Sequence, residues 1–258
     1  MSPAIQHLHA GGHRLEYQLI PARRAGLPTL VFLHQGLGCL ALWRDWPSML
    51  AANTGCPVLV YSRYGYGRSE IIQGPREPGF LVEEGAIVLP AILLTLGIDD
   101  VILIGHSDGG TAALSYAGKG QPLRALAVVA PHVCDEPATQ AAITRHRDAW
   151  PTSLMRERMA RYHDDADKTF HSWAEVWLSA RNAGWSIEDL LPNVSCPMLA
   201  IQGVDDDHGT MMQIDRIKVL ARGPVTLEKL PACGHDPFRD QPQRMLATLT
   251  AFVTAHRG

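Results

Sequence analysis

The chain has 258 residues, of which 46% are hydrophobic, and a formal net charge of −3 without a run of basic residues. This composition supports one large buried core and argues against a nucleic-acid-binding surface. No apolar stretch approaches the roughly 20 residues that cross a bilayer, and no N-terminal segment joins basic residues to a long apolar run. We therefore expect neither a membrane anchor nor a signal peptide. The five cysteines are scattered and odd in number, which favours a reducing, cytoplasmic location.

The predicted elements begin with a hairpin, because residues 5–9 and 14–20 alternate in polarity around a glycine-containing turn. Strand and helix patterns then alternate along the chain. The predicted strands are 30–33, 58–61, 101–104, 126–130, 198–202 and 225–230, and the predicted helices are 42–52, 81–96, 111–117, 211–220 and one that follows Pro237. This alternation indicates an α/β fold with a mostly parallel sheet and helices on both faces.

The alternation stops between residues 132 and 192, where no convincing buried strand appears and apolar residues take helical spacing. Four of the six tryptophans lie in this stretch: Trp150, Trp173, Trp177 and Trp185. We predict an α/β core of residues 1–131 and 193–258, with a helical cap insertion at 132–192. The histidines show no metal-site spacing, so no metal site is expected.

The most informative motif is the stretch GHSDGG at 105–110, which follows an apolar strand and opens a helix. A G-x-S-x-G sequence in this context predicts a sharp turn that exposes a serine hydroxyl above the sheet. A helix N-terminus at the same point favours developing negative charge. Ser107 is therefore the candidate nucleophile, and the alternative is an ordinary glycine-serine turn in which Ser107 caps the helix.

A serine nucleophile needs a base, and the base needs an acid that orients it. His235 follows the last predicted strand, so it lies at the same carboxyl edge of the sheet as Ser107. The loop after the preceding strand carries Asp205, Asp206 and Asp207. We select Asp206 as the acid, with Asp205 as the alternative, and the order Ser, Asp, His suits this arrangement of strands.

The oxyanion formed by attack needs hydrogen-bond donors. One is the backbone N–H that follows the nucleophile, which belongs to Asp108. The other is expected in the glycine-containing loop at 34–38, which follows the first parallel strand. The alternative is that this loop is a turn without contact to substrate.

These motifs resemble the α/β-hydrolase superfamily over essentially the full length of the chain. They are HQGLG at 34–38, SRYGYGRS at 62–69, GHSDGG at 105–110, GVDD at 203–206 and GH at 234–235. The second is similar to the family's D-x-x-G-x-G-x-S loop, with Ser62 in place of the usual Asp. The resemblance implies that the second oxyanion donor is Gly36 and also selects Asp206 as the acid. Gln35 departs from the commonest His-Gly pattern and places a side chain within reach of the pocket.

Some members of this superfamily use Asp as the nucleophile, as in epoxide hydrolases and haloalkane dehalogenases. Here Ser107 has that position and Asp108 comes one residue later, so we do not expect those reactions. Asp108 has two interpretations. It is either a carboxylate that the helix dipole favours or a group that faces the pocket and disfavours anionic substrates.

The insertion resembles the helical cap that covers the site in many members, and its tryptophans would line a mainly apolar pocket. We name Gln35, Leu37, His132, Trp173 and Trp177 as candidate substrate-binding residues. The alternative is that the tryptophans only fasten the cap to the core. His132 and Glu136 form either a polar pair that faces the site or a structural hydrogen bond.

We therefore expect a serine hydrolase that cleaves a small, mostly apolar ester, thioester or lactone through an acyl-enzyme, without a metal or organic cofactor. Hydrolysis of a carbon–carbon bond or an amide, and cofactor-free perhydrolysis, use the same three residues and stay open. A non-catalytic protein that binds a small ligand on the same fold is the second hypothesis. The sequence leaves open whether the chain forms a homodimer.

Overall fold

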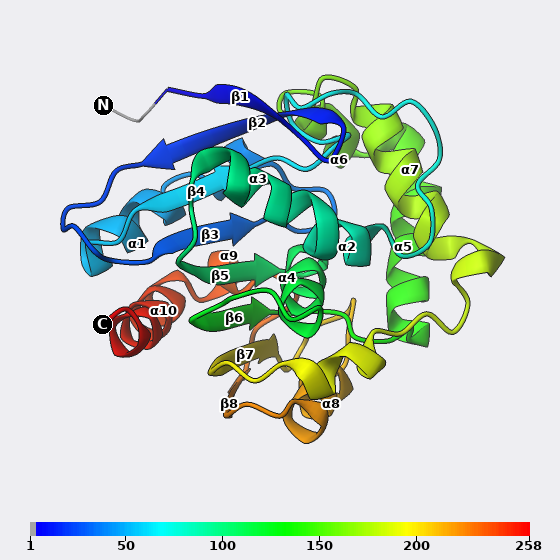
Figure 1. Ribbon diagram of the computed structural model, residues 1–258. Coiled ribbons are helices and arrows are strands. Elements are labelled where there is room, and N and C mark those ends of the chain that lie inside the picture. Colours follow the sequence, from blue (N-terminus) through cyan, green and yellow to red (C-terminus); the bar gives the residue numbers. More distant parts are fainter. Residues whose placement is uncertain (1–3) are drawn as a thin grey trace.

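The computed structural model describes residues 4–258, which form one eight-stranded sheet in the order β1-β2-β4-β3-β5-β6-β7-β8 (Figure 1). The strands are β1 (Gln6–Ala10), β2 (His13–Ile20), β3 (Thr29–Leu33), β4 (Val58–Tyr61), β5 (Val101–His106), β6 (Ala125–Val129), β7 (Met198–Gly203) and β8 (Val225–Leu230). β2 pairs antiparallel with both β1 and β4, and all other neighbours are parallel. The predicted fold class is confirmed.

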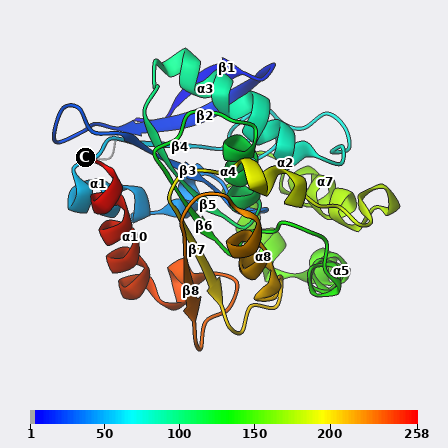
Figure 2. The same cartoon turned by 60° about the horizontal axis from the view of Figure 1, so that its bottom comes forward.

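Helices cover both faces of this sheet, as the sequence predicts (Figure 2). They are α1 (Trp46–Thr54), α2 (Phe80–Glu83), α3 (Leu89–Leu96), α4 (Asp108–Gly118), α5 (Pro137–Ala149), α6 (Leu154–Met159), α7 (Ala166–Leu178), α8 (Met212–Leu220), α9 (Pro237–Asp240) and α10 (Pro242–His256). Successive side chains of a strand point to opposite faces. In β3, Leu30 and Phe32 therefore join the core shared with α1 and α10, whereas Val31 and Leu33 join the core shared with α3 and α4.

The helix predicted at 42–52 is wrong at its start. Leu40–Trp43 form a 3₁₀ turn, and Arg44 has a φ of 51°, so the chain leaves the helical path before α1 begins. Pro47 lies in the first turn of α1, where its missing N–H has no helical partner to lose. This proline fixes the start of α1 four residues later than expected.

The long helix predicted at 81–96 contains a wider turn. α2 continues into a π-helical turn at Glu84–Val88 and then into α3. Pro90 has no N–H for the carbonyl four residues earlier, and its ring crowds that carbonyl. A local π turn relieves this conflict while the apolar face stays against the sheet.

Residues 132–192, which we call the cap segment, leave the sheet after β6 and return to it at β7. Their helices α5, α6 and α7 lie beyond the carboxyl ends of the parallel strands (Figure 1). α6 is a short helix that ends at Met159. α5 was not singled out from the sequence, and it contributes three side chains to the site described below.

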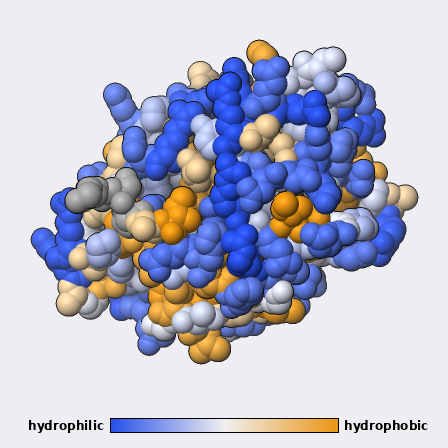
Figure 3. Space-filling view, turned by 90° about the horizontal axis from the view of Figure 1, so that it is seen from above, coloured by the Kyte–Doolittle hydropathy of each residue, from blue (hydrophilic) through white to orange (hydrophobic). Residues whose placement is uncertain are grey.

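Within residues 4–258, no helix is both long and apolar enough to cross a membrane. The face over β1 and α3 is mainly hydrophilic, with apolar groups in separate spots (Figure 3).

Candidate active site

Ser107 occupies the junction between β5 and α4 in a strained backbone conformation. Its φ and ψ are 52° and −121°, a combination that costs a non-glycine residue free energy. The turn is held because the N–H groups of Gly110 and Thr111 both donate to the Ser107 carbonyl. Gly109 permits the tight approach, since a Cβ there would lie 2.1 Å from the carbonyl oxygen of Leu33. The predicted sharp turn is therefore present.

His235 approaches Ser107 from the loop between β8 and α9. Its Nε2 lies 2.9 Å from the Oγ of Ser107, and its Nδ1 lies 2.8 and 2.9 Å from the two carboxylate oxygens of Asp206. The Nε2–H of His106 donates to the His235 carbonyl at 2.8 Å, and this hydrogen bond holds the loop in position. Burial lowers the pKa of His106 to about 4, so this supporting ring is neutral near pH 7.

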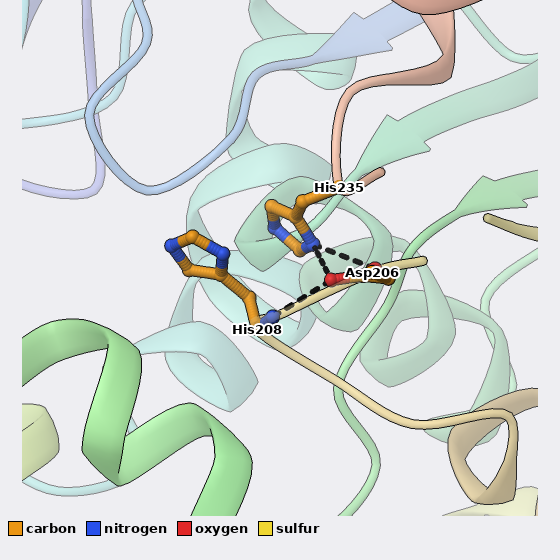
Figure 4. Close-up of side chains that lie close together, drawn as sticks. All are labelled: Asp206, His208 and His235. Atoms are coloured by element: carbon orange, nitrogen blue, oxygen red, sulfur yellow. Dashed lines mark hydrogen bonds and ion pairs between the residues drawn. The ribbon is translucent and has the colours of Figure 1, made fainter. Parts of the chain in front are cut away.

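Asp206 is the one of the three consecutive aspartates that reaches His235. It also accepts a hydrogen bond from the side chain of Gln202. Figure 4 shows its contacts with His235 and with the backbone N–H of His208. Burial alone would raise the pKa of Asp206, but the hydrogen bonds from His235 and from the His208 N–H hold it below its usual value. Asp205 is exposed and Asp207 pairs with Arg145 at 2.8 Å, so neither competes for the histidine.

A cavity of about 100 Å³ opens beside this chain of hydrogen bonds. It is lined by Ser107 and His235, by both predicted oxyanion-donor residues and by every residue named as a candidate for substrate binding: Gly36, Asp108, Gln35, Leu37, His132, Trp173 and Trp177. Residues of both the core and the cap segment therefore line this cavity. Asp206 is not among the lining residues.

Asp108 faces this cavity rather than solvent. Its carboxylate accepts a hydrogen bond from the indole N–H of Trp173 at 3.2 Å and lies 4.0 Å from the guanidinium of Arg63. Burial raises the pKa of Asp108, although Arg63 opposes this effect. Gly36 packs against the same pair, since a Cβ there would lie 2.3 Å from the indole nitrogen of Trp173.

His132 also faces the cavity, and its ring centre lies 5.7 Å from that of His235. Burial lowers the pKa of His132 to about 3, so the ring is neutral near pH 7. Glu136 accepts from the N–H and hydroxyl of Thr210 instead of pairing with His132. Of the two interpretations of Glu136, the structural hydrogen bond is the one observed.

Sequence reasoning missed four further cavity residues. Thr139, Ile143 and His146 come from α5, and His208 follows the aspartate run. The first three are spaced i, i+4 and i+7, which is the pattern of one helix face. That spacing was a usable signal, whereas His208 had none beyond its closeness to Asp206.

Asp206, His208 and His235 also have ligand atoms within 4.8 Å of one another, close enough to hold a metal ion. However, both oxygens of Asp206 already accept from His235. A metal ion would have to replace that hydrogen bond. The arrangement fits a proton-transfer chain better than a metal site.

Residues 30–248 match the model of the Alpha/beta hydrolase family. The chain belongs to this family. A proline iminopeptidase of Lactiplantibacillus plantarum is 30% identical over 113 residues, which are 43% of the chain and only 38% of that relative. The chain thus spans well under half of the length of this curated relative. A putative carbamate hydrolase RutD of Stutzerimonas stutzeri is 28% identical over 74% of the chain and 79% of its own length.

Among solved α/β-hydrolase structures, the enol-lactonase of Burkholderia xenovorans LB400 superposes with a TM-score of 0.76. It is 19% identical and covers 96% of the chain and 100% of its own length. At this identity the likeness shows the fold. The α/β-hydrolase resemblance read from the sequence is confirmed.

Proposed function

We propose that the chain is a serine hydrolase that cleaves a small, mostly apolar ester, thioester or lactone through an acyl-enzyme. The observation that carries this proposal is the hydrogen-bonded series from Ser107 through His235 to Asp206 beside a cavity. A hydroxyl bonded to an imidazole that is itself bonded to a buried carboxylate is the arrangement that activates a serine.

The reaction begins when the Ser107 oxygen attacks the substrate carbonyl carbon and its proton passes to Nε2 of His235. Asp206 holds His235 through Nδ1–H and stabilises the imidazolium that forms. The backbone N–H groups of Gly36 and Asp108 are assigned to the oxyanion. His235 then gives its proton to the leaving alcohol, thiol or ring oxygen as the carbon–oxygen or carbon–sulfur bond breaks. Water that loses a proton to His235 afterwards releases the acid and restores Ser107.

The cavity supports a small and largely uncharged acyl group. Its volume is about 100 Å³, and Leu37, Ile143, Trp173 and Trp177 form apolar parts of its wall. Burial of apolar surface favours binding of such a group. The buried carboxylate of Asp108 also faces this space, which counts against an anionic substrate. The expected partner of this site is a single small substrate molecule. Whether the chain forms a homodimer is independent of this proposal.

A fluorophosphonate probe tests the proposal because it labels only an activated serine. The parent protein should be labelled and Ser107→Ala should not, with both proteins folded by circular dichroism. Loss of the nucleophile should lower turnover of p-nitrophenyl acetate by about 10⁶-fold. An unlabelled parent would favour the non-catalytic, ligand-binding hypothesis. Turnover by Ser107→Ala within tenfold of the parent would contradict the mechanism.

Amide hydrolysis is a second candidate, favoured by the identity to a proline iminopeptidase. Parallel assays of p-nitrophenyl esters, lactones and p-nitroanilides separate the two. Higher kcat/KM on an anilide than on the matched ester would favour the amide reaction, with the same Ser107-dependent labelling.

A further inference from the structure

Arg63 is buried beneath the loop that follows β3, and only 2% of its side chain is exposed. It comes from the loop after β4, and its guanidinium donates to two consecutive backbone carbonyls. Nη1 lies 2.7 Å from the oxygen of His34, and Nη2 lies 3.1 Å from that of Gln35. The guanidinium lies 4.9 Å from the centre of the Tyr66 ring, which packs against it. Two directed hydrogen bonds from one planar group fix the orientation of the backbone they meet.

The second of these carbonyls shares a peptide group with the N–H of Gly36. A trans peptide is planar, so its N–H points away from its C=O. With the Gln35 oxygen directed at Arg63, the Gly36 N–H points to the opposite side of the loop. Gly36 lines the cavity beside Ser107, whereas Arg63 does not.

The Gln35 oxygen receives further support from its neighbours. The Nδ1–H of His34 donates to it at 2.8 Å, and the N–H of Gly38 donates at 3.0 Å. The backbone N–H of Arg63 in turn donates to Nε2 of His34 at 3.1 Å, which defines the tautomer of that ring. Burial and the nearby charge of Arg63 keep the pKa of His34 well below its usual value, so the ring is neutral. Donors that converge on a carbonyl polarise the peptide and strengthen its N–H as a donor.

The same guanidinium also reaches Asp108, the second residue whose backbone N–H is assigned to the oxyanion. Its Nη2 lies 4.0 Å from the Asp108 carboxylate, and both side chains are nearly inaccessible to solvent. Asp108 supplies the second N–H assigned to the oxyanion. One side chain therefore contacts both the peptide group that carries the Gly36 N–H, through the Gln35 carbonyl, and the carboxylate of Asp108.

We infer that Arg63 is the positioning residue of the oxyanion hole: it sets the direction of the Gly36 N–H and the separation of Gly36 from Asp108. This role rests on the proposed hydrolase function and adds a residue that does not touch the substrate. A lysine cannot replace it, because an ammonium group lacks the planar fork that serves two fixed carbonyls.

Arg76 offers a matched control. It is a second arginine beside Arg63, and the two line a separate cavity of about 230 Å³. Its guanidinium donates to the carbonyl of Tyr64 and lies over the rings of Tyr66 and Phe80. It makes no hydrogen bond to Gly36, Gln35 or Asp108 within the described residues.

The test measures kcat and KM of Arg63→Ala, Arg63→Lys and Arg76→Ala with p-nitrophenyl acetate. A donor displaced by about 1 Å costs on the order of 10²-fold in rate. We expect kcat to fall by about that factor in both Arg63 variants with KM changed less than threefold, and Arg76→Ala to keep kcat within threefold. Guanidinium chloride at low millimolar concentration should then raise kcat of Arg63→Ala, because the adjoining cavity gives access to the vacated position. Ammonium chloride at the same ionic strength should not.

The outcomes separate this inference from the proposed function. A parent that hydrolyses esters, together with a folded Arg63→Lys whose kcat stays within threefold, would overturn the positioning role and leave the hydrolase intact. A rise in KM at constant kcat would overturn it as well. If Arg63→Ala fails to fold, Arg63→Lys decides by the same comparison. A parent without esterase activity or probe labelling would remove the proposed function itself.

Discussion

The indole N–H of Trp173 donates to the carboxylate of Asp108, so a cap-segment helix is hydrogen-bonded to the residue that follows Ser107. The distance is 3.2 Å and both groups are buried. α7 and α4 are far apart in the chain, and this contact joins them at the cavity wall. It couples the position of the cap segment to the geometry beside the candidate nucleophile.

Trp173→Phe should destabilise the protein, because it removes the indole donor and keeps an aromatic ring. Leaving a buried acceptor without its partner costs about 1–3 kcal/mol. Urea denaturation at pH 7 measures the free energy of unfolding. In an Asp108→Ala background the acceptor is absent, so Trp173→Phe should lower the free energy of unfolding by clearly less. Equal losses in the two backgrounds would show that ring packing, not the hydrogen bond, explains the effect.

Asp206→Asn should lower kcat by roughly 10⁴-fold, because the amide can hold His235 in the wrong tautomer. Asp205→Asn and Asp207→Asn are matched controls at neighbouring positions, and neither residue bonds to His235. Steady-state assays with p-nitrophenyl acetate compare all three. If Asp205→Asn were the most damaging, the acid would be misassigned although the reaction class would stand.

Much of this site was accessible from the sequence because its parts are local. The strand, turn and helix around Ser107 form one continuous motif, and the turn that follows β8 carries His235. Parallel strands end at one edge of a sheet, so the loops after β3, β5, β7 and β8 had to meet there. The strand topology therefore predicts that these separate motifs lie close together at one edge of the sheet.

Several features that were missed depend on more than the local sequence pattern. The direction of Arg63 under the 34–38 loop follows from a fit between two loops about thirty residues apart, which no periodicity encodes. The π turn before α3 is likewise decided by a single proline inside an otherwise regular apolar pattern. His208 reaches the cavity only because the loop after β7 turns around Asp206. Contacts between distant segments therefore decided the positions of Arg63 and His208, whereas the π turn follows from the local effect of Pro90.

His163 should make stability depend on pH. It lies between α6 and α7, where its Nδ1 accepts from the N–H of Gly67 at 2.9 Å and its Nε2–H donates to the Leu37 carbonyl at 3.2 Å. Burial lowers its pKa to about 4 in the folded chain, whereas an unfolded histidine titrates near 6.5. Between these values the unfolded chain binds the proton more readily, so stability is complete above pH 6.5 and is lost as the pH falls towards 4.

A comparison with His163→Asn isolates this contribution, since an amide keeps one acceptor and one donor but does not titrate. The free energy of unfolding of the parent should fall between pH 7 and pH 5 by about 2 kcal/mol more than that of the variant. Urea denaturation at both pH values provides the numbers. Parallel pH dependences in the two proteins would show that protonation of His163 is not coupled to folding.

The final prediction concerns the four tryptophans of the cap segment, which the structure separates into two groups. Trp173 and Trp177 line the cavity, whereas Trp150 stacks on Phe170 at 3.8 Å and Trp185 packs against Trp177. An apolar wall binds an acyl chain by burial, at roughly 0.8 kcal/mol per CH₂. Trp177→Ala and Trp173→Ala should therefore change the kcat/KM ratio of p-nitrophenyl octanoate to p-nitrophenyl acetate by about 10–200-fold.

Trp185→Ala is the control for this experiment, because it removes a tryptophan that touches Trp177 but does not line the cavity. Its octanoate-to-acetate ratio should stay within about threefold of the parent, after circular dichroism has shown that each variant folds. Equal losses on both esters in the cavity variants would mean that Trp173 and Trp177 hold the site together without selecting the acyl chain. A ratio that shifts as far in Trp185→Ala as in Trp177→Ala would point to movement of the whole cap segment, and the wall assignment would then fail.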